Sequence, residues 1–230
     1  MGSAFCHITV ATLPQDTCLR NRIIDAADTL VDDATDDRID ALGGDDTVAG
    51  KVGDDIIMGG DGDDALRGDA NSRDPQDDKI GGNDIIFGDE ESDRIGGKSD
   101  NDILSGDAGN DFIWGDDGDD IIMGVIANDT LVGDNFSGGS GSDLFVFDNG
   151  DGTDTIVDFE AGSDRIGLVE GELLFADLIL TQDGNNTLLG VISTGETLAI
   201  LNNVQASALS ENSFETVADI STVEEALAII

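Results

Sequence analysis

The apolar positions of this chain repeat with a period of nine over its middle part. Aspartates stand nine residues apart over 37–64 and again over 84–129, and the second residue after each is apolar. Because alternate residues of a strand point to opposite sides, this spacing predicts short strands that each turn one apolar side chain inward. The predicted inward positions are Ile39, Val48, Ile57, Leu66, Ile80, Ile86, Ile95, Leu104, Ile113, Ile122, Leu131, Phe145, Ile156 and Ile166.

A single repeat is too short to fold alone. In GGDGDDALR at 59–67, the glycines permit a tight turn, and only three residues remain for a strand. Such a unit buries its one apolar side chain only when copies stack on each other. Residues 32–168 are therefore predicted to form an all-β solenoid, preceded by a cap at 1–31 and followed by a region at 169–230.

Composition adds a strong charge. The 230 residues contain 10 Lys and Arg against 51 Asp and Glu, which gives a formal net charge of −41. A surface with this charge does not suit a nucleic acid or an anionic membrane as partner. Most of the acidic residues are Asp, which favours turns over helix interiors.

Stacking would place these aspartates in rows along the turns. Layers about 4.8 Å apart would bring like charges close together, so the rows require cations between them. Carboxylate and carbonyl oxygens select a hard ion, and irregular turn geometry suits Ca²⁺ better than octahedral Mg²⁺. A plain acidic, solvated turn surface is the alternative interpretation.

These repeats resemble the RTX, or haemolysin-type, calcium-binding nonapeptide repeats with the pattern GGxGxDxUx. The best matches are GGDGDDALR (59–67), GDAGNDFIW (106–114), GDDGDDIIM (115–123) and GGSGSDLFV (138–146). Residues 137–168 resemble the segment that closes such rolls in secreted proteases and toxins, and 175–214 resemble the β-hairpin cap that follows. The resemblance implies a parallel β-roll with calcium between its turns, and export by a type I secretion apparatus.

The candidate calcium ligands follow from the repeat pattern. Three turns depart from it, at 88–93, 97–102 and 124–129, because they lack the glycine two residues before the aspartate. The predicted side-chain ligands are Asp46, Asp55, Asp64, Asp111, Asp120 and Asp143, with Asp84, Asp93, Asp102 and Asp129 as further ligands. The predicted turn glycines are Gly44, Gly53, Gly62, Gly109, Gly118 and Gly141. About eight Ca²⁺ ions are expected.

No catalytic centre is expected. His7 has no second histidine at ligand spacing, and Ser137 does not lie in a strand-to-helix GxSxG turn. Adjacent acid pairs such as Asp119 and Asp120 recur in many repeats, which favours a structural role over catalysis.

The two ends are predicted to close the roll. Residues 17–31 place apolar side chains on one helical face and are expected to form a helical cap. Cys6 and Cys18 could form a disulfide, a reduced pair or two separate thiols. The tail STVEEALAII (221–230) is similar to type I export signals and has capping-box spacing at Ser221 and Glu224. We expect an extracellular or cell-surface protein without a cleaved leader.

One outer wall of the roll is predicted to be apolar. If 65–84 counts as two repeats, one wall carries Thr47 and Ala65 followed by large apolar residues, namely Ile85, Phe87, Ile103, Ile121, Met123, Leu144 and Val146. A soluble monomer does not normally leave such a patch in water. It would be covered by the C-terminal hairpin, 175–201, or by self-association or a protein partner.

The resulting hypothesis is a secreted, calcium-binding β-roll that acts as a structural or adhesive surface module. The alternative is the export-and-folding domain of a larger RTX enzyme or toxin. The 31 residues before the repeats are too few for a further folded domain of their own.

Overall fold

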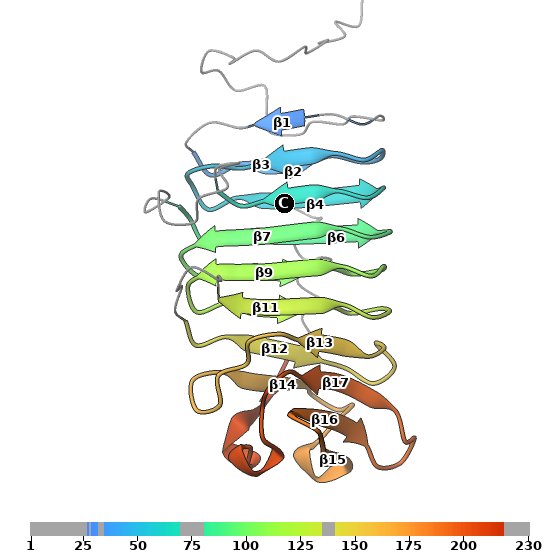
Figure 1. Ribbon diagram of the computed structural model, residues 1–230. Coiled ribbons are helices and arrows are strands. Elements are labelled where there is room, and N and C mark those ends of the chain that lie inside the picture. The colour runs from blue at the N-terminus through green and yellow to red at the C-terminus, as the bar shows by residue number, and fades with distance from the viewer. Residues whose placement is uncertain (1–26, 28, 32–34, 70–80, 135–140, 219–230) are drawn as a thin grey trace, which may run out of the picture.

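The computed structural model describes residues 27, 29–31, 35–69, 81–134 and 141–218. Within these ranges the chain forms strands and short 3-10 helices, and no α-helix occurs. Figure 1 shows the strands stacked as successive rungs along one axis, with the C-terminal elements at one end.

The strands form two sheets. The first has ten strands in the order β1 (Thr29–Val31), β3 (Thr47–Ala49), β5 (Ala65–Arg67), β7 (Arg94–Ser99), β9 (Phe112–Asp117), β11 (Thr130–Asp134), β13 (Asp154–Ile156), β17 (Thr197–Leu201), β16 (Asn186–Val191) and β15 (Leu178–Asp183). The second has eight in the order β18 (Phe214–Val217), β14 (Arg165–Val169), β12 (Leu144–Phe147), β10 (Ile121–Met123), β8 (Ile103–Ser105), β6 (Ile85–Glu90), β4 (Ile56–Asp61) and β2 (Arg38–Asp40).

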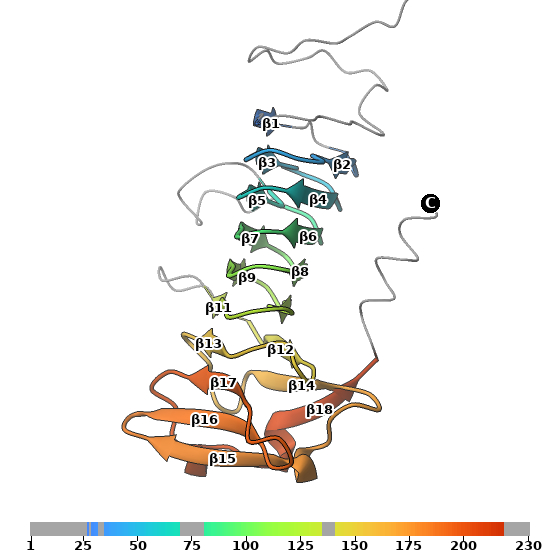
Figure 2. The same ribbon diagram turned by 90° about the vertical axis from the view of Figure 1, so that its right-hand side faces the viewer.

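From β2 to β14, consecutive strands alternate between the two sheets, so two repeats make one full turn of the roll (Figure 2). Each strand there pairs in parallel with the strand of the next layer. Ile103 aligns with Ile121, for example, and Phe112 aligns with Thr130. The predicted all-β parallel roll is confirmed.

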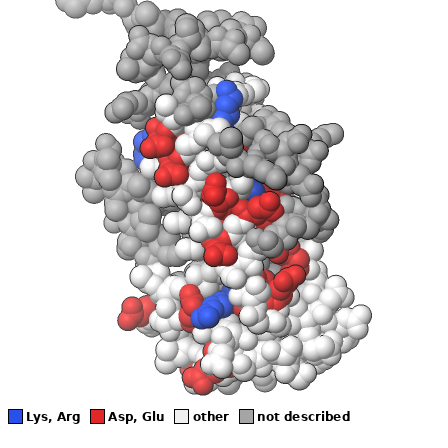
Figure 3. Space-filling view, turned by 90° about the vertical axis from the view of Figure 1, so that its left-hand side faces the viewer, with Lys and Arg blue, Asp and Glu red and all other residues white. Residues whose placement is uncertain are grey.

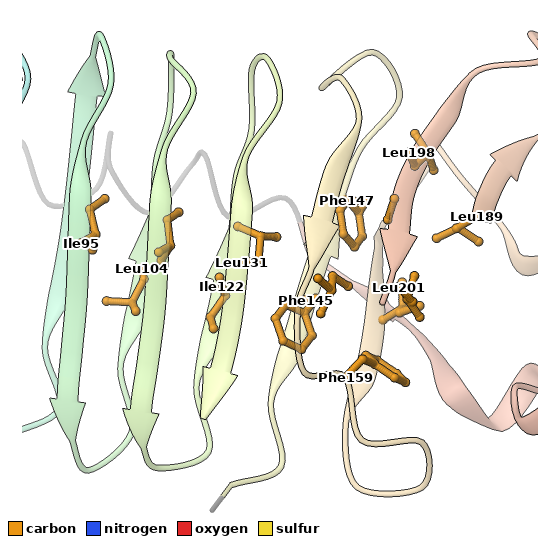
Figure 4. Packing of buried hydrophobic residues seen from close by; sticks show 14 of the residues in the cluster. Ile95, Leu104, Ile122, Leu131, Phe145, Phe147, Phe159, Leu189, Leu198 and Leu201 are labelled. Carbon is orange, nitrogen blue, oxygen red and sulfur yellow. The ribbon is translucent and has the colours of Figure 1, made fainter. Parts of the chain in front are cut away.

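The core is one column of side chains between the sheets. Apart from Ile80, which lies outside the described residues, every predicted inward residue is buried, with Leu30 added in β1. Figure 4 shows Ile95, then Leu104, then Ile122 beside Leu131 along the column, followed by aromatic side chains near the cap. The rings of Phe145 and Phe159 lie 6.0 Å apart between centroids.

The C-terminal cap, residues 175–217, closes this end of the roll. Strands β15 and β16 form the antiparallel hairpin expected there, β16 pairs with β17, and β17 continues the ten-stranded sheet beside β13. Three 3-10 helices, Phe175–Asp177, Ala206–Ala208 and Glu211–Ser213, connect these strands and β18. The rings of Phe175 and Phe214 pack 4.8 Å apart within the cap.

Two predictions about the outer walls were wrong. Strand β5 pairs directly with β7, and β4 pairs directly with β6, so residues 65–84 do not supply two repeats to the stacked sheets. Ile56 and Met58 therefore share a sheet with Ile85, whereas Thr47 and Ala65 lie in the other sheet. The hairpin also does not fold back over the apolar wall, because its backbone hydrogen bonds extend the ten-stranded sheet.

The N-terminal cap was predicted to be a helix, but the part of it that the structure describes is a strand. Most of residues 17–31 lie outside the described ranges, but Thr29–Val31 is a strand, β1, that pairs with β3. Pairing with an open sheet edge satisfies backbone groups that a helix would leave on that edge. His7, Cys6 and Cys18 also lie outside the described residues.

Candidate calcium sites

Two rows of aspartates run along the roll, one at each side where the chain passes between the sheets. In each row, one aspartate accepts a hydrogen bond through Oδ1 from the backbone N–H of the aspartate one layer before it. The Asp84 N–H, for example, donates to Asp102 Oδ1 at 2.8 Å. The first row contains Asp55, Asp84, Asp102, Asp120, Asp143 and Asp164, and the second contains Asp46, Asp64, Asp93, Asp111, Asp129 and Asp154.

The second carboxylate oxygen, Oδ2, faces the interior. All side chains of both rows are at most 4% exposed. A buried carboxylate oxygen without a partner is costly unless a cation or a proton compensates it. Among the described residues, no hydrogen bond reaches the buried Oδ2 atom of Asp64, Asp84, Asp93, Asp102, Asp111, Asp120 or Asp143.

These oxygens converge with backbone carbonyls beside the first glycine of each turn. A Cβ atom on Gly59 would lie 2.5 Å from Asp64 Oδ2 and 2.6 Å from the carbonyl oxygen of Gly88, one layer further along. A corresponding arrangement recurs beside Gly115. Each such point offers a carboxylate oxygen and a carbonyl oxygen around a space that a side chain would fill, which fits a hard cation.

Burial dominates the electrostatics of the rows. It raises the pKa of Asp102 to about 10, and repulsion from Asp120 adds to the shift. In a folded, metal-free roll, the Asp102 carboxyl would therefore keep its proton near neutral pH, and a cation would have to displace that proton. Burial also raises the pKa to about 8 for Asp84, Asp93 and Asp143, and to about 7 for Asp111 and Asp120.

The glycines at the fourth position of the turns allow close stacking. A Cβ on Gly62, which has a φ of 135°, would lie 2.6 Å from the Gly44 carbonyl oxygen of the preceding turn on that side. A Cβ on the predicted turn glycines Gly53, Gly109, Gly118 or Gly141 would likewise clash with the backbone of the turn before.

The three turns that lack the glycine, 88–93, 97–102 and 124–129, follow the same backbone path as the other turns. Glu91, Asp100 and Ala127 stand where the other turns have glycine, with φ angles of 71°, 70° and 98°. Left-handed backbone at these residues keeps Asp93, Asp102 and Asp129 in their rows. The structure thus brings all ten predicted aspartates together in two rows, and their role as ligands stays a prediction.

Sequence reasoning missed several buried acids. Asp154 and Asp164 end the two rows, although the spacing before them is irregular. Asp69 and Asp116 lie on the second position of their turns, and Lys98 Nζ lies 3.6 Å from Asp116 Oδ2. The buried second position could have been suspected, because Asp recurs there in the sequence as it does at position six.

A second, exposed ladder runs outside each row. The Asn101 N–H donates to Asn83 Oδ1 at 3.1 Å, and the Asp119 N–H donates to Asn101 Oδ1 at 2.9 Å. This ladder explains why Asp, Asn or Ser precedes each row aspartate except Asp154, which follows Thr153, since these side chains accept hydrogen bonds close to the backbone.

Acidic side chains follow the length of the roll in the space-filling view, with few basic ones among them (Figure 3). Nowhere in the described ranges do three His, Cys, Asp or Glu side chains converge into one metal-binding group. A cation in either row would therefore need backbone carbonyls in addition to the aspartates. Across the same ranges, no helix is long and apolar enough to cross a membrane.

Fold and site together define a calcium-binding β-roll module. The model of the RTX calcium-binding nonapeptide repeat matches four copies, at residues 24–57, 42–72, 81–95 and 96–131. Residues 24–72 and 81–131 therefore match the RTX calcium-binding nonapeptide repeat. Repeats of this family are typical of secreted proteins.

Similar solved structures include two β-roll proteins. The AlgE6R3 subunit of the Azotobacter vinelandii mannuronan C5-epimerase is 23% identical, with a TM-score of 0.41 over 56% of this chain and 79% of that one. The extracellular lipase LipA from Serratia marcescens is 17% identical, with a TM-score of 0.36 over 81% of this chain and 39% of the lipase. No curated protein matches the chain.

Proposed function

We propose that this protein is a secreted structural or adhesive module whose roll folds when calcium fills the two rows, and that it has no catalytic centre. The main support is the set of buried Oδ2 atoms without hydrogen bonds, which recurs in successive layers on both sides of the roll. Repetition of one arrangement favours a structural ion over a single reactive site.

Charge supports the coupling of calcium to folding. The net charge of −41 opposes compaction of the metal-free chain. About eight Ca²⁺ ions would add roughly +16, which offsets about two fifths of that charge. Metal-dependent folds that lack a preformed site remain unfolded until the ion binds.

Folding that requires calcium binding would also suit export of the chain. A chain kept unfolded where calcium is scarce could pass a type I secretion apparatus and fold outside, where sites of roughly 10⁻⁴ to 10⁻³ M affinity fill. Expression beside such an apparatus, with and without residues 219–230, tests this part. Equal amounts outside the cell for both chains would contradict a C-terminal export signal.

The test of calcium-coupled folding combines calorimetry, mass-spectrometric metal counting and circular dichroism on the full chain. We expect about eight bound Ca²⁺ ions and a gain of strand signal at millimolar calcium. Magnesium at the same concentration is the matched control and should not fold the chain, because it dehydrates reluctantly and demands octahedral geometry. Equal strand signal in excess chelator would overturn the proposal.

A further inference from the structure

The outer side of the eight-stranded sheet is apolar over several layers. We call this surface the apolar outer face; it comprises Ile56, Met58, Ile85, Phe87, Ile103, Ile121, Met123, Leu144 and Val146. At its cap end, Met123 and Val146 cluster with Val169, and partly buried Val125 and Val217 pack against them.

Several outward side chains of this face are nevertheless buried. Phe87 is 4% exposed, Val146 5% and Met123 8%. Neighbouring layers pack beside an outward side chain and do not lie over it. Figure 2 shows no described strand or 3-10 helix stacked on this side of the sheet. Because the burial arises within a single chain, it favours another part of the same chain as the cover.

The topology favours the C-terminal segment as that cover. Residues 219–230 follow β18, which is the terminal strand of the same sheet and carries Val217 on the cluster. Residues 70–80 and 135–140 both connect the ten-stranded sheet to the start of strands β6 and β12. Val146 stands near the other end of β12, and Phe87 lies in the middle of β6.

The apolar pattern and the length of residues 219–230 also fit the apolar outer face. Val223, Leu227 and Ile230 have the spacing of one apolar face of a helix. Twelve residues in a helix span about 18 Å. The five strands from β14 to β6 are separated by four spacings, which span about 19 Å. We propose that residues 219–230 dock their Val223, Leu227 and Ile230 side chains on the apolar outer face, from Val169 to Phe87.

Methionine oxidation tests this docking in the full chain. Met123 lies under the proposed segment, whereas Met58 lies one layer beyond its reach and is an internal control. In millimolar calcium, the Val223→Asp/Leu227→Asp variant should raise the rate at which peroxide oxidises Met123 by about tenfold, because cover is lost. The rate at Met58 should stay unchanged. Peptide mass spectrometry measures both rates.

The matched control variant is Thr222→Asp/Ala228→Asp, which adds the same charge away from the apolar side of the segment. It should leave the oxidation of Met123 at the wild-type rate. An unchanged Met123 rate in the Val223→Asp/Leu227→Asp variant would overturn the proposal. So would a wild-type mass of two chains by light scattering that falls to one chain in this variant, because a second copy would then be the cover.

A measurement on the wild-type protein covers the case in which the variants do not fold. Glu224 and Glu225 are cleavage sites for a glutamate-specific protease. In millimolar calcium, cleavage there should be at least about tenfold slower than in a free peptide of residues 219–230. Cleavage at the rate of the free peptide would contradict docking.

Discussion

The repeat layers and the C-terminal cap of this protein are stabilised in different ways. In the repeat layers, the aspartates beside the core column are buried, and no hydrogen bond reaches the Oδ2 atoms of Asp64, Asp84, Asp93, Asp102, Asp111, Asp120 and Asp143. In the described residues 175–217, Thr187 is the one buried polar side chain, and its hydroxyl donates to the Val204 carbonyl at 2.8 Å. The cap therefore satisfies its own polar groups, whereas the repeats bury carboxylate oxygens that a cation would compensate.

Glycine substitutions should lower the free energy of unfolding far more in the repeat layers than in the cap, and this is the largest difference we expect between the two regions. A Cβ on Gly118 would overlap the Asp100 carbonyl oxygen, whereas Gly184 in the cap hairpin has open space and a φ of 60°. We expect Gly118→Ala to cost about 3 kcal/mol or more in calcium, and Gly184→Ala about 1 kcal/mol. Thermal unfolding in millimolar calcium measures both, and equal costs would contradict the close stacking of turns.

Removal of one carboxylate from a row should lower the stability of the protein with calcium and raise it without calcium. Asp102→Asn should lower the calcium count per chain and destabilise the calcium-bound roll. In calcium-free buffer it should stabilise the chain by on the order of 2 kcal/mol, because a neutral amide is cheaper to bury than an acid whose pKa burial raises to about 10. Asp183→Asn in the exposed cap hairpin is the matched control and should change neither. A loss of stability in both buffers would contradict this account.

The metal-free roll should gain structure as the pH falls. Burial raises the pKa of Asp84 and Asp143 to about 8, from 3.8. The metal-free fold therefore binds more protons than the unfolded chain, and its stability is full below about pH 4 and lost as the pH rises through about 8. Circular dichroism of dialysed, calcium-free protein should show more strand at pH 5 than at pH 9. With calcium the order should reverse, because protons compete with the ion.

The smallest of these effects is expected from substitutions on the apolar outer face. Ile103→Asp combined with Ile121→Asp changes half-buried outward residues and leaves the turns intact. The calcium count should stay unchanged, while protease resistance falls by a few-fold as the cover of the apolar outer face loosens. Mass-spectrometric metal counting and limited proteolysis measure the two quantities. Wild-type protease resistance would show that this face is ordinary solvent-exposed surface.

The sequence predicted the layers because each one repeats the same local rule. Each repeat consists of an aspartate, a strand of three residues and one inward apolar side chain. Leu104 and Ile122 could therefore be placed in the core without coordinates. The rows of aspartates followed from the same period, since stacking brings equivalent positions together.

The errors arose where the period is interrupted. Between Leu66 and Ile86, the sequence has enough residues and apolar character for an additional repeat, so length alone could not decide between a loop and a layer. The position of the cap was also not determined by its sequence. Its alternating pattern predicts strands, but whether β17 pairs with β13 or packs over a face depends on edge pairing between distant residues.

Amide hydrogen exchange at neutral pH, with calcium and after its removal, tests the dependence of the roll on calcium most directly. Removal of calcium should accelerate exchange in β6, β8 and β10 by at least about a hundredfold, because the buried carboxylates of those layers then lose the ion or must take up protons. Exchange in β15 and β16 should change far less, since their hairpin satisfies its own polar groups. Equal protection of β8 and β10 in both conditions would contradict the account.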